Sequence, residues 1–342
     1  MRSSIFSFDY ELFLGSDSGQ VDKCLIHPTQ KILKILNRHA VRGVFFIDTI
    51  YLIRLQQLAD KNERARADFE MIGSQLVEIR KHNHYLFIHL HPHWLDAVYN
   101  EDCNTWDLSD NHRYRLTALT HEEQRHYFNT SLLLLSSILS KNAEEIGNGY
   151  RAGGWSITPF TTFRPHFIEH GIKYDFTVIP GKILHSNLQH YDFTHAPNKR
   201  YYRFNDVIDQ EDANGPFTEF PVSVYTMSRF FSVLSDYYEK LFHFLTTRFF
   251  KQKSKGKTAS ASNTIVSEFT SADGKPLFVS QFEDLNIFLF ISMLLSFRKR
   301  NHLHSISHPK LFTFWDFIYL KLFLLTFNHK VTTDFLMIEK MN

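Results

Sequence analysis

Short apolar runs and amphipathic segments alternate along the first half of the chain. The runs "SSIFSF" (residues 3–8), "VRGVFFI" (41–47) and "HYLFIHL" (84–90) are typical of strands. Residues 27–40 and 64–81 lie between them and carry apolar side chains at helical spacing. Parallel strands need crossover connections, which are usually helices. The pattern therefore predicts an α/β fold with parallel strands, whose functional groups should gather at the carboxyl ends of the strands.

The same rhythm continues to about residue 180. Residues 121–139 and 161–170 are predicted helices, "GYRAGGW" (149–155) is a strand end that turns through glycines, and "IKYDFTV" (172–178) is a further strand. No internal repeat with a solenoid or propeller period is found.

The pattern changes after "FTEFPVSVY" (217–225). We expect a long aromatic helix at 229–250, a basic flexible loop at 251–264, and a buried or membrane-touching helix in the apolar run 287–297. A strand "HLHSISHPK" (302–310) and a closing helix (311–327) follow. We interpret residues 1–342 as a single domain with a helical and flexible insertion at about 226–300.

Composition narrows the class of protein. The chain has 342 residues, of which 43% are hydrophobic, and 38 Lys and Arg balance 36 Asp and Glu, so there is no electrostatic footprint of nucleic-acid binding. Two cysteines cannot form a disulfide framework. The N-terminal segment carries acidic residues, and the late apolar run is shorter than the ~20 residues of a membrane span. We expect a cytoplasmic protein without a transmembrane segment.

Two carboxylates follow the first predicted strand, in "FSFDYELFLG". Asp9 and Glu11 are two residues apart, so on a strand both side chains project from one face while Tyr10 points the other way. Such a pair suits metal binding or base catalysis. The alternative is a solvated acidic pair at the start of a loop.

Three histidines end another predicted strand, in "FIHLHPHW". His89 and His91 share one face of the strand, and the bend at Pro92 can bring His93 around to the same centre. Two neutral imidazoles and one carboxylate would bind a divalent ion and leave a position open for water or substrate. The alternative is a strand end with surface histidines. Three histidines within five residues favour the metal site.

The order of motifs "SFDYE", "GVFFI", "HLHPH", "YRAGGW", "FPVS" and "SISHPK" resembles the polysaccharide deacetylase family, the NodB-homology group of carbohydrate esterase family four. The resemblance spans most of the chain. It implies an α/β fold that is a distorted, incomplete (β/α) barrel with about seven parallel strands. It also implies metal-dependent removal of an acetyl group from an N-acetyl amino sugar.

The resemblance assigns roles to the first two motifs. Asp9 matches the catalytic base, while Tyr10 stands where the family has a metal-binding aspartate, so Glu11 could supply the missing carboxylate. Which of the two acids contacts the metal stays open. His89 and His93 match the two metal histidines, and His91 would be an extra ligand or a substrate-binding residue. The expected ion is zinc, with cobalt, nickel, iron or manganese as alternatives.

The later motifs would complete the chemistry. Arg151 matches the arginine that pairs with the base, next to glycines that allow close backbone approach, and His308 matches the late general acid. Arg151 could instead be a surface cation, and His308 could merely close a strand. Trp94 and Trp155 could stack on a sugar ring or simply be packed.

The expected function is therefore hydrolysis of an N-acetyl or similar N-acyl group on an amino sugar during biosynthesis of a surface polysaccharide. A cytoplasmic location favours a nucleotide-linked or lipid-linked precursor as substrate, and the insertion could make a peripheral membrane contact. Two alternatives remain. One is a catalytically inactive barrel that binds carbohydrate, and the other is a deformylase or deacylase of another small amide.

Overall fold

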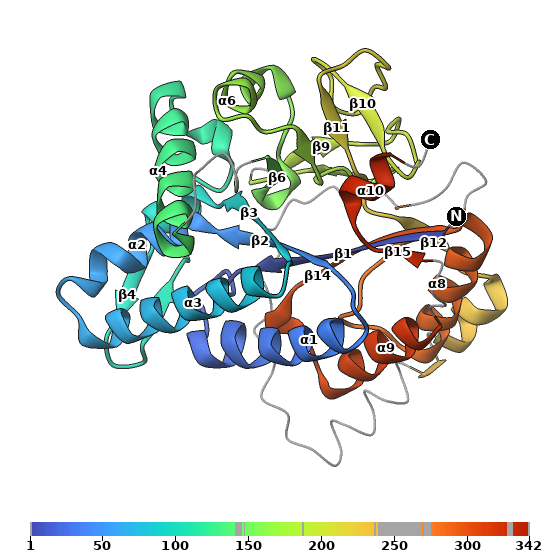
Figure 1. The fold of residues 1–342 in the computed structure, drawn as a ribbon, viewed down its shortest axis with the longest axis horizontal. Coiled ribbons are helices and arrows are strands. Elements are labelled where there is room, and N and C mark those ends of the chain that lie inside the picture. Colours follow the sequence, from blue (N-terminus) through green and yellow to red (C-terminus); the bar gives the residue numbers. More distant parts are fainter. Residues whose placement is uncertain are drawn as a thin grey trace.

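A nine-stranded sheet organises the chain (Figure 1). The computed structural model describes residues 2–140, 146, 148–186, 188–235, 237–238, 269, 275–326 and 331–340. The strand order is β10-β11-β7-β6-β3-β2-β1-β14, and β15 also pairs with β1. The strands are β1 (Arg2–Tyr10), β2 (Gly43–Asp48), β3 (Tyr85–Leu90), β6 (Gly149–Ala152), β7 (Tyr174–Asp175), β10 (Tyr202–Phe204), β11 (Phe217–Glu219), β14 (His302–Ser307) and β15 (Val331–Thr332).

Helices flank this sheet, and three separate two-stranded hairpins lie outside it. The helices are α1 (His27–Arg38), α2 (Thr49–Ala59), α3 (Glu63–Lys81), α4 (His121–Leu139), α6 (Arg164–Glu169), α8 (Ile287–Arg300), α9 (Phe314–Leu325) and α10 (Phe335–Glu339). The hairpins pair β4 (Val98–Asn100) with β5 (Thr105–Asp107), β8 (Ile183–His185) with β9 (His190–Asp192), and β12 (Val224–Thr226) with β13 (Leu277–Val279).

Strands β11, β7, β6, β3, β2, β1 and β14 run parallel, and β10 pairs antiparallel at the edge. The segment after β11 curls back toward the other end of the sheet. The Val222 amide donates to the Val178 carbonyl (2.8 Å), and the Ser223 amide donates to the His304 carbonyl in β14 (2.9 Å). Backbone hydrogen bonds outside the regular strand pairing therefore connect β14 with the segment that follows β11. The sheet is a distorted, incomplete (β/α) barrel, as predicted.

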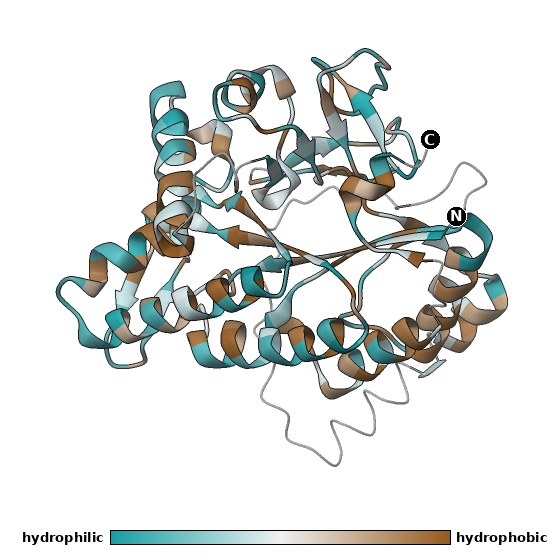
Figure 2. Ribbon diagram, viewed as in Figure 1, coloured by the Kyte–Doolittle hydropathy of each residue, from teal (hydrophilic) through white to brown (hydrophobic). Residues whose placement is uncertain are grey.

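The strands bury both of their faces, as expected for a parallel sheet covered by helices. Ile5, Phe46 and Phe87 belong to a cluster on the inner face, which Phe335 and Ile338 of α10 also join. The other face packs against helices in the main core. Figure 2 shows hydrophobic residues along the strands and on α8 and α9. Strand β15 pairs with Arg2 and Ser3 at the amino-terminal end of β1, and α10 follows β15 at that end. The motif residues instead follow the carboxyl ends of the strands, so the candidate site lies at the opposite end of the barrel from β15.

Predicted helices with a clear amphipathic stripe match α1, α3 and α4 closely. The sequence did not predict α2, which buries most of its length and so lacks a polar face. Asp48 caps this helix, since its Oδ1 accepts from the Tyr51 amide (3.3 Å). The predicted helix 161–170 is shorter in the structure, where a 3₁₀ turn (Phe160–Thr162) precedes α6.

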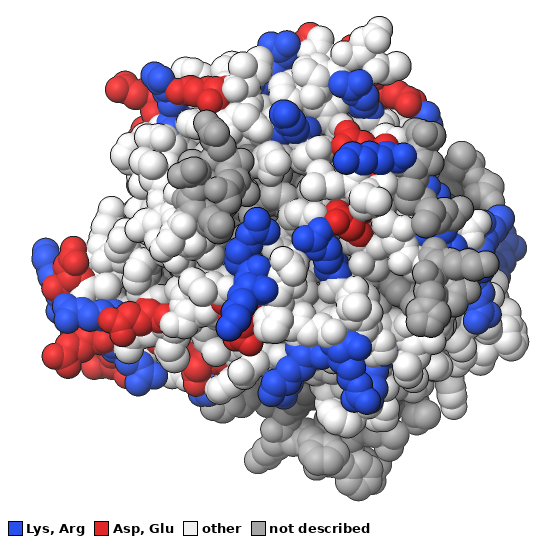
Figure 3. Space-filling view, in the orientation of Figure 1, with Lys and Arg blue, Asp and Glu red and all other residues white. Residues whose placement is uncertain are grey.

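The expected insertion at 226–300 stays a prediction. Residues 229–235 are helical, but most of the predicted helix 229–250 and all of the predicted loop 251–264 lie outside the described residues. The apolar run 287–297 falls in α8, where Phe290, Met293 and Phe297 join the main core. In the part of the chain that the structure describes, no helix combines the length and apolar character needed to cross a membrane. The face shown in Figure 3 carries both basic and acidic groups.

Candidate metal and catalytic site

Residues from four of five consecutive parallel strands, β6, β3, β1 and β14, meet at the carboxyl end of the barrel. Asp9 lies in β1 with Glu11 just beyond it, and His89 lies in β3 with His91 just beyond it. Arg151 lies in β6, and His308 directly follows β14. This is the end of a (β/α) barrel where catalytic groups gather, and the strand order brings the sequence-predicted residues together.

Glu11, His89 and His91 converge on one point. Glu11 Oε2 lies 2.7 Å from His91 Nε2 and 3.5 Å from His89 Nε2, and the two Nε2 atoms are 3.0 Å apart. The three residues form a group whose ligand atoms lie within 4.8 Å of one another.

The tautomer of His89 is fixed by the backbone. Its Nδ1 lies 2.9 Å from the Arg151 carbonyl oxygen, which can only accept, so Nδ1 carries the hydrogen. In the neutral ring, Nε2 therefore presents a lone pair to the convergence point. A lone pair, a carboxylate oxygen and a second imidazole nitrogen need a shared proton or a cation between them. Two imidazoles and one carboxylate fit a divalent ion such as zinc, and a carbonyl behind one imidazole is the usual support for such a ligand.

The charges around this point favour a cation. Burial alone would raise the pKa of Glu11, but Lys310 (Nζ to Oε1, 2.9 Å) and the His91 and His89 imidazoles hold it well below its ordinary value. Burial would lower the pKa of His89, yet the Asp9 and Glu11 carboxylates outweigh it and raise that pKa. The carboxylate is therefore ionised and the imidazole attracts positive charge.

Arg151 holds Asp9 in place. The arginine is completely buried, which excludes the alternative of a surface cation. Its Nη1 donates to Asp9 Oδ1 (2.5 Å), its Nη2 to Ser7 Oγ (2.8 Å), and its Nε to the Phe176 carbonyl (3.0 Å). The second oxygen of Asp9, Oδ2, faces the centre at 3.9 Å from His89 Nε2. This oxygen is the available proton acceptor.

His308 faces the same centre from the other side. Its Nε2 lies 3.7 Å from Asp9 Oδ2 and 3.6 Å from Glu11 Oε1, while its Nδ1 lies 2.8 Å from Glu283 Oε1. Burial would lower the pKa of His308, but the hydrogen bond and charge of Glu283 outweigh it and raise that pKa. The raised pKa favours the charged ring of His308, in which Nε2 carries a hydrogen that it can donate toward the centre.

Sequence reasoning missed Glu283 and Lys310. Glu283 is buried just before α8 and lies within the predicted insertion at about 226–300, so no spacing to a motif identified it. Lys310 lies two residues after His308, in a 3₁₀ turn (Pro309–Leu311) that aims its ammonium at Glu11.

His93 lies beside the converging group and is not part of it. Pro92 starts a 3₁₀ turn (Pro92–Leu95), and the ring of His93 stacks on Tyr114 with centroids 5.5 Å apart. Its Nδ1 is buried without a hydrogen-bond partner, and burial, followed by the charge of His91, lowers its pKa well below the ordinary value. The structure thus places His91, and not His93, in contact with Glu11 and His89. The ligand roles stay predictions.

The two tryptophans differ in their surroundings. Trp94 is 1% exposed, donates from Nε1 to Asp48 Oδ2 (2.5 Å) and packs on Tyr51, so its ring is part of the core. Trp155 is partly exposed and lies near two cations, Arg151 (5.8 Å) and Lys182 (5.7 Å). Trp155 is thus the better placed of the two to contact a substrate.

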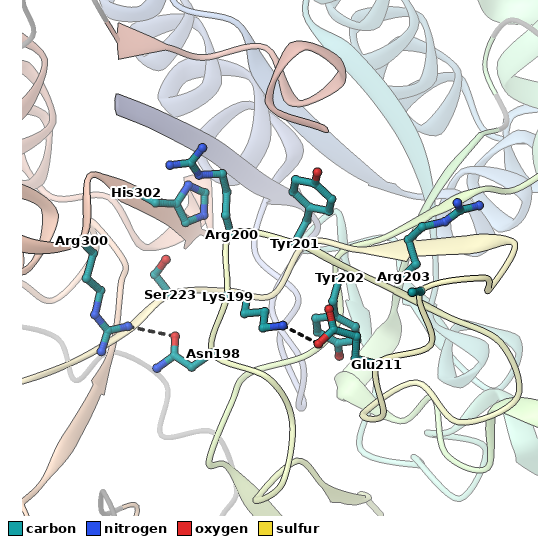
Figure 4. Close-up of a pocket in the computed structure, with 11 residues that line it drawn as sticks. Asn198, Lys199, Arg200, Tyr201, Tyr202, Arg203, Glu211, Ser223, Arg300 and His302 are labelled. Carbon is teal, nitrogen blue, oxygen red and sulfur yellow. Dashed lines mark hydrogen bonds and ion pairs between the residues drawn. The ribbon is translucent and has the colours of Figure 1, made fainter. Parts of the chain in front are cut away.

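A cavity of about 720 Å³ lies elsewhere, between the two end strands of the open barrel, β10 and β14 (Figure 4). Lys199 pairs with Glu211 there, and Arg300 donates to Asn198 Oδ1 (2.9 Å). Its lining includes His302 at the amino-terminal end of β14, whereas the candidate metal and catalytic residues gather at the other end of that strand.

Three solved structures are similar to this chain. A putative polysaccharide deacetylase from Mycobacterium smegmatis has 14% identity and a TM-score of 0.47, with 99% of this chain and 88% of that chain covered. A probable polysaccharide deacetylase from Pseudomonas aeruginosa PAO1 has 10% identity and a TM-score of 0.48, with coverages of 97% and 87%. Puue allantoinase has 10% identity and a TM-score of 0.44, with coverages of 97% and 86%.

No family model and no curated protein matches the sequence. The structural neighbours include two proteins that carry the family name to which the motif order pointed. These likenesses are remote in identity, and the fold class stands on the strand order of the chain itself. Any function must be argued from the side chains of the site.

Proposed function

We propose that this protein is a metal-dependent hydrolase that removes an N-acetyl or similar N-acyl group from an amino sugar. The observation that carries the proposal is the convergence of Glu11, His89 and His91 on one point. The buried Asp9–Arg151 pair and the His308–Glu283 pair both face that point. Amide hydrolysis needs an activated water, stabilisation of the oxyanion and a proton for the leaving amine. The site holds a candidate for each.

Glu11, His89 and His91 would hold the divalent ion, which lowers the pKa of bound water and polarises the substrate carbonyl. Asp9 Oδ2 takes the proton of the attacking water. Arg151 orients Asp9, because its guanidinium is always charged, donates to Asp9 Oδ1, and has its other donors held by Phe176 and Ser7. His308 would donate a proton from Nε2 to the departing nitrogen, and Glu283 orients the ring and favours its charged form.

The substrate class follows from the family resemblance of the motifs. An amino sugar would be presented as a nucleotide-linked or lipid-linked precursor, in the cytoplasm, during biosynthesis of a surface polysaccharide. Trp155 would stack on the sugar, because its ring is partly exposed beside Arg151. Zinc is the proposed ion, and cobalt, nickel, iron or manganese would fit the same ligands.

A second candidate function is a barrel that binds carbohydrate without hydrolysing it. Lys310 favours this alternative, because its ammonium lies 2.9 Å from Glu11 Oε1 and competes with a metal for that carboxylate. The Tyr10 departure from the family motif points the same way, since the Tyr10 hydroxyl is buried and donates to Gln75 (2.8 Å), away from the metal centre.

Acetate release from N-acetylated nucleotide sugars tests the proposal. We expect release by the wild type to stop with a chelator and return with zinc. Asp9→Asn and His308→Ala should each lower kcat by about 100-fold or more, the usual contribution of general acid–base groups. His195→Ala, which changes an exposed histidine, is the matched control.

Circular dichroism must accompany Asp9→Asn, because this change leaves the buried Arg151 without a charged partner. Activity that survives the chelator, or full activity in both folded variants, would contradict the mechanism. Zinc binding without acetate release would favour the binding barrel.

A further inference from the structure

A second group of potential metal ligands lies on the outside of the barrel. His166, Glu169 and His170 can each offer one ligand atom, and these three atoms lie within 4.8 Å of one another. His166 and Glu169 belong to α6 and His170 directly follows it, so the three sit at positions i, i+3 and i+4 on one helical face. They contact α4 through Gln124 and Arg125, and the figure shows the two helices as neighbours (Figure 1).

The protonation of His166 follows from Gln124. The Gln124 amide nitrogen donates to the carbonyls of Leu116 (3.2 Å) and Leu119 (2.9 Å), which orients its Oε1 toward His166 Nε2 at 3.2 Å. An amide oxygen can only accept, so Nε2 of His166 carries the hydrogen and Nδ1 carries the lone pair. This Nδ1 is buried without a hydrogen-bond partner. A completely buried side chain therefore presents an unsatisfied acceptor.

The imidazole of His170 also has a buried nitrogen without a partner. Its Nε2 is also buried without a hydrogen-bond partner. Phe128 of α4 lies nearly parallel to both imidazoles, at 4.9 Å and 16° from His166 and at 5.8 Å and 10° from His170. The phenyl ring thus holds both imidazoles in fixed orientations.

Glu169 supplies the charge. Its Oε1 accepts from Arg125 Nε (2.7 Å), and this bond orients the carboxylate. The exposed His121 has its ring centroid 4.7 Å from that of His166 and could approach as a further ligand. The ligand atoms around a tetrahedral zinc ion lie roughly 3.3 Å apart, so only small side-chain movements would close the group.

We propose that His166, Glu169 and His170 form a second divalent-cation site, separate from the catalytic centre, which binds zinc or a similar borderline ion. Two imidazoles and a carboxylate select zinc, cobalt, nickel or copper over magnesium and calcium. Gln124 and Arg125 of α4 form hydrogen bonds with the proposed ligands His166 and Glu169 and so orient them. A bound ion would therefore stabilise the packing of α6 on α4. The role is structural, because none of these residues touches the catalytic groups.

Zinc stoichiometry, measured by equilibrium dialysis of the full chain and metal analysis, tests this site. The wild type should bind two ions, and His170→Ala and His91→Ala should bind one each. The double variant should bind none. His126→Ala, an exposed histidine of α4, is the matched control and should still bind two.

Thermal unfolding gives a second readout. Zinc should raise the Tm of His91→Ala. Adding Glu169→Gln to His91→Ala should reduce that rise, and the double variant of His91→Ala and His170→Ala should show no rise. If His170→Ala still binds two ions, or if His91→Ala binds none, the second site is overturned. A single ion that is lost only in His91→Ala would overturn the second site and leave the proposed catalytic centre intact.

Discussion

His84, His89 and His308 each have one ring nitrogen fixed by a neighbour, and that contact determines what the other nitrogen can do. His89 is fixed by a backbone carbonyl and offers a lone pair, whereas His308 is fixed by Glu283 and offers a proton. The sequence contains 20 histidines, and their spacing does not reveal these contacts. Residue type and strand position predicted the candidates, but their tautomers depend on residues far away in the chain.

His84 provides a test of this reasoning through the pH dependence of stability. Its Nδ1 accepts from the Gly43 amide (2.9 Å), so its Nε2 donates to Asn37 Oδ1 (2.9 Å). Burial, with smaller contributions from His82 and Arg42, lowers the pKa of His84 from 6.5 to about 4. Between these two pH values the unfolded chain takes up a proton that the folded chain refuses. The stabilisation is therefore complete above pH 6.5 and is lost as the pH falls toward 4.

Linkage gives a loss of about 2.5 kcal/mol in the free energy of unfolding between pH 7 and 4.5 from this residue alone. Urea denaturation at the two pH values should show that His84→Gln removes most of this difference. His195→Gln, which changes an exposed histidine, should retain it. An identical pH dependence in the wild type and His84→Gln would show that His84 is not held neutral.

At the scale of elements, the close approach of β3 and β6 positions His91, one of the proposed metal ligands. A Cβ atom at Gly153 would lie 2.3 Å from the Leu90 carbonyl oxygen and 2.9 Å from His91 Nδ1. Glycine is therefore required where the end of β6 passes the end of β3. The sequence indicated this approach through "RAGG", and the structure identifies Gly153 as a position where a side chain does not fit.

We expect Gly153→Ala to destabilise the fold by about 1–3 kcal/mol, the usual cost of overpacking, and to weaken zinc binding by moving His91. Gly73→Ala is the matched control. It lies inside α3, where the nearest atom to a new Cβ is 3.8 Å away, so it should stabilise the helix by about 0.5–1 kcal/mol. Urea denaturation and zinc titration measure both effects. Wild-type stability and zinc affinity in Gly153→Ala would contradict the close approach.

Helices were predicted correctly where the hydrophobic pattern had a clear helical period, and they were missed where burial on all sides removed that pattern. Helices α1, α3 and α4 have polar and apolar faces, whereas α2 is buried for most of its length and reads as neither helix nor strand. The short hairpins β4–β5 and β8–β9 have three residues per strand, which is too few for a pattern to emerge.

At the scale of the whole molecule, long-range pairing builds the site. Strand β1 lies between β2 and β14, so residues about 300 positions apart in the sequence become neighbours, as Phe8 and Ser307 do. The rule that parallel strands present their carboxyl ends together predicted which side chains would meet. It could not predict Glu283 or Lys310, whose positions depend on the chain path before and after β14. It also could not decide between His91 and His93, because the turn at Pro92 sets their directions.

The central claim is that Glu11, His89 and His91 hold a divalent ion beside Asp9. Anomalous diffraction at the zinc edge, from crystals of the protein grown with zinc, tests it most directly. We predict a peak about 2.0–2.2 Å from a carboxylate oxygen of Glu11 and from Nε2 of both His89 and His91. A peak bound by His93 in place of His91 would restore the ligand set that the motif resemblance implies. Zinc-containing crystals with no peak beside Glu11 and His89 would contradict the metal centre and, with it, the proposed hydrolysis.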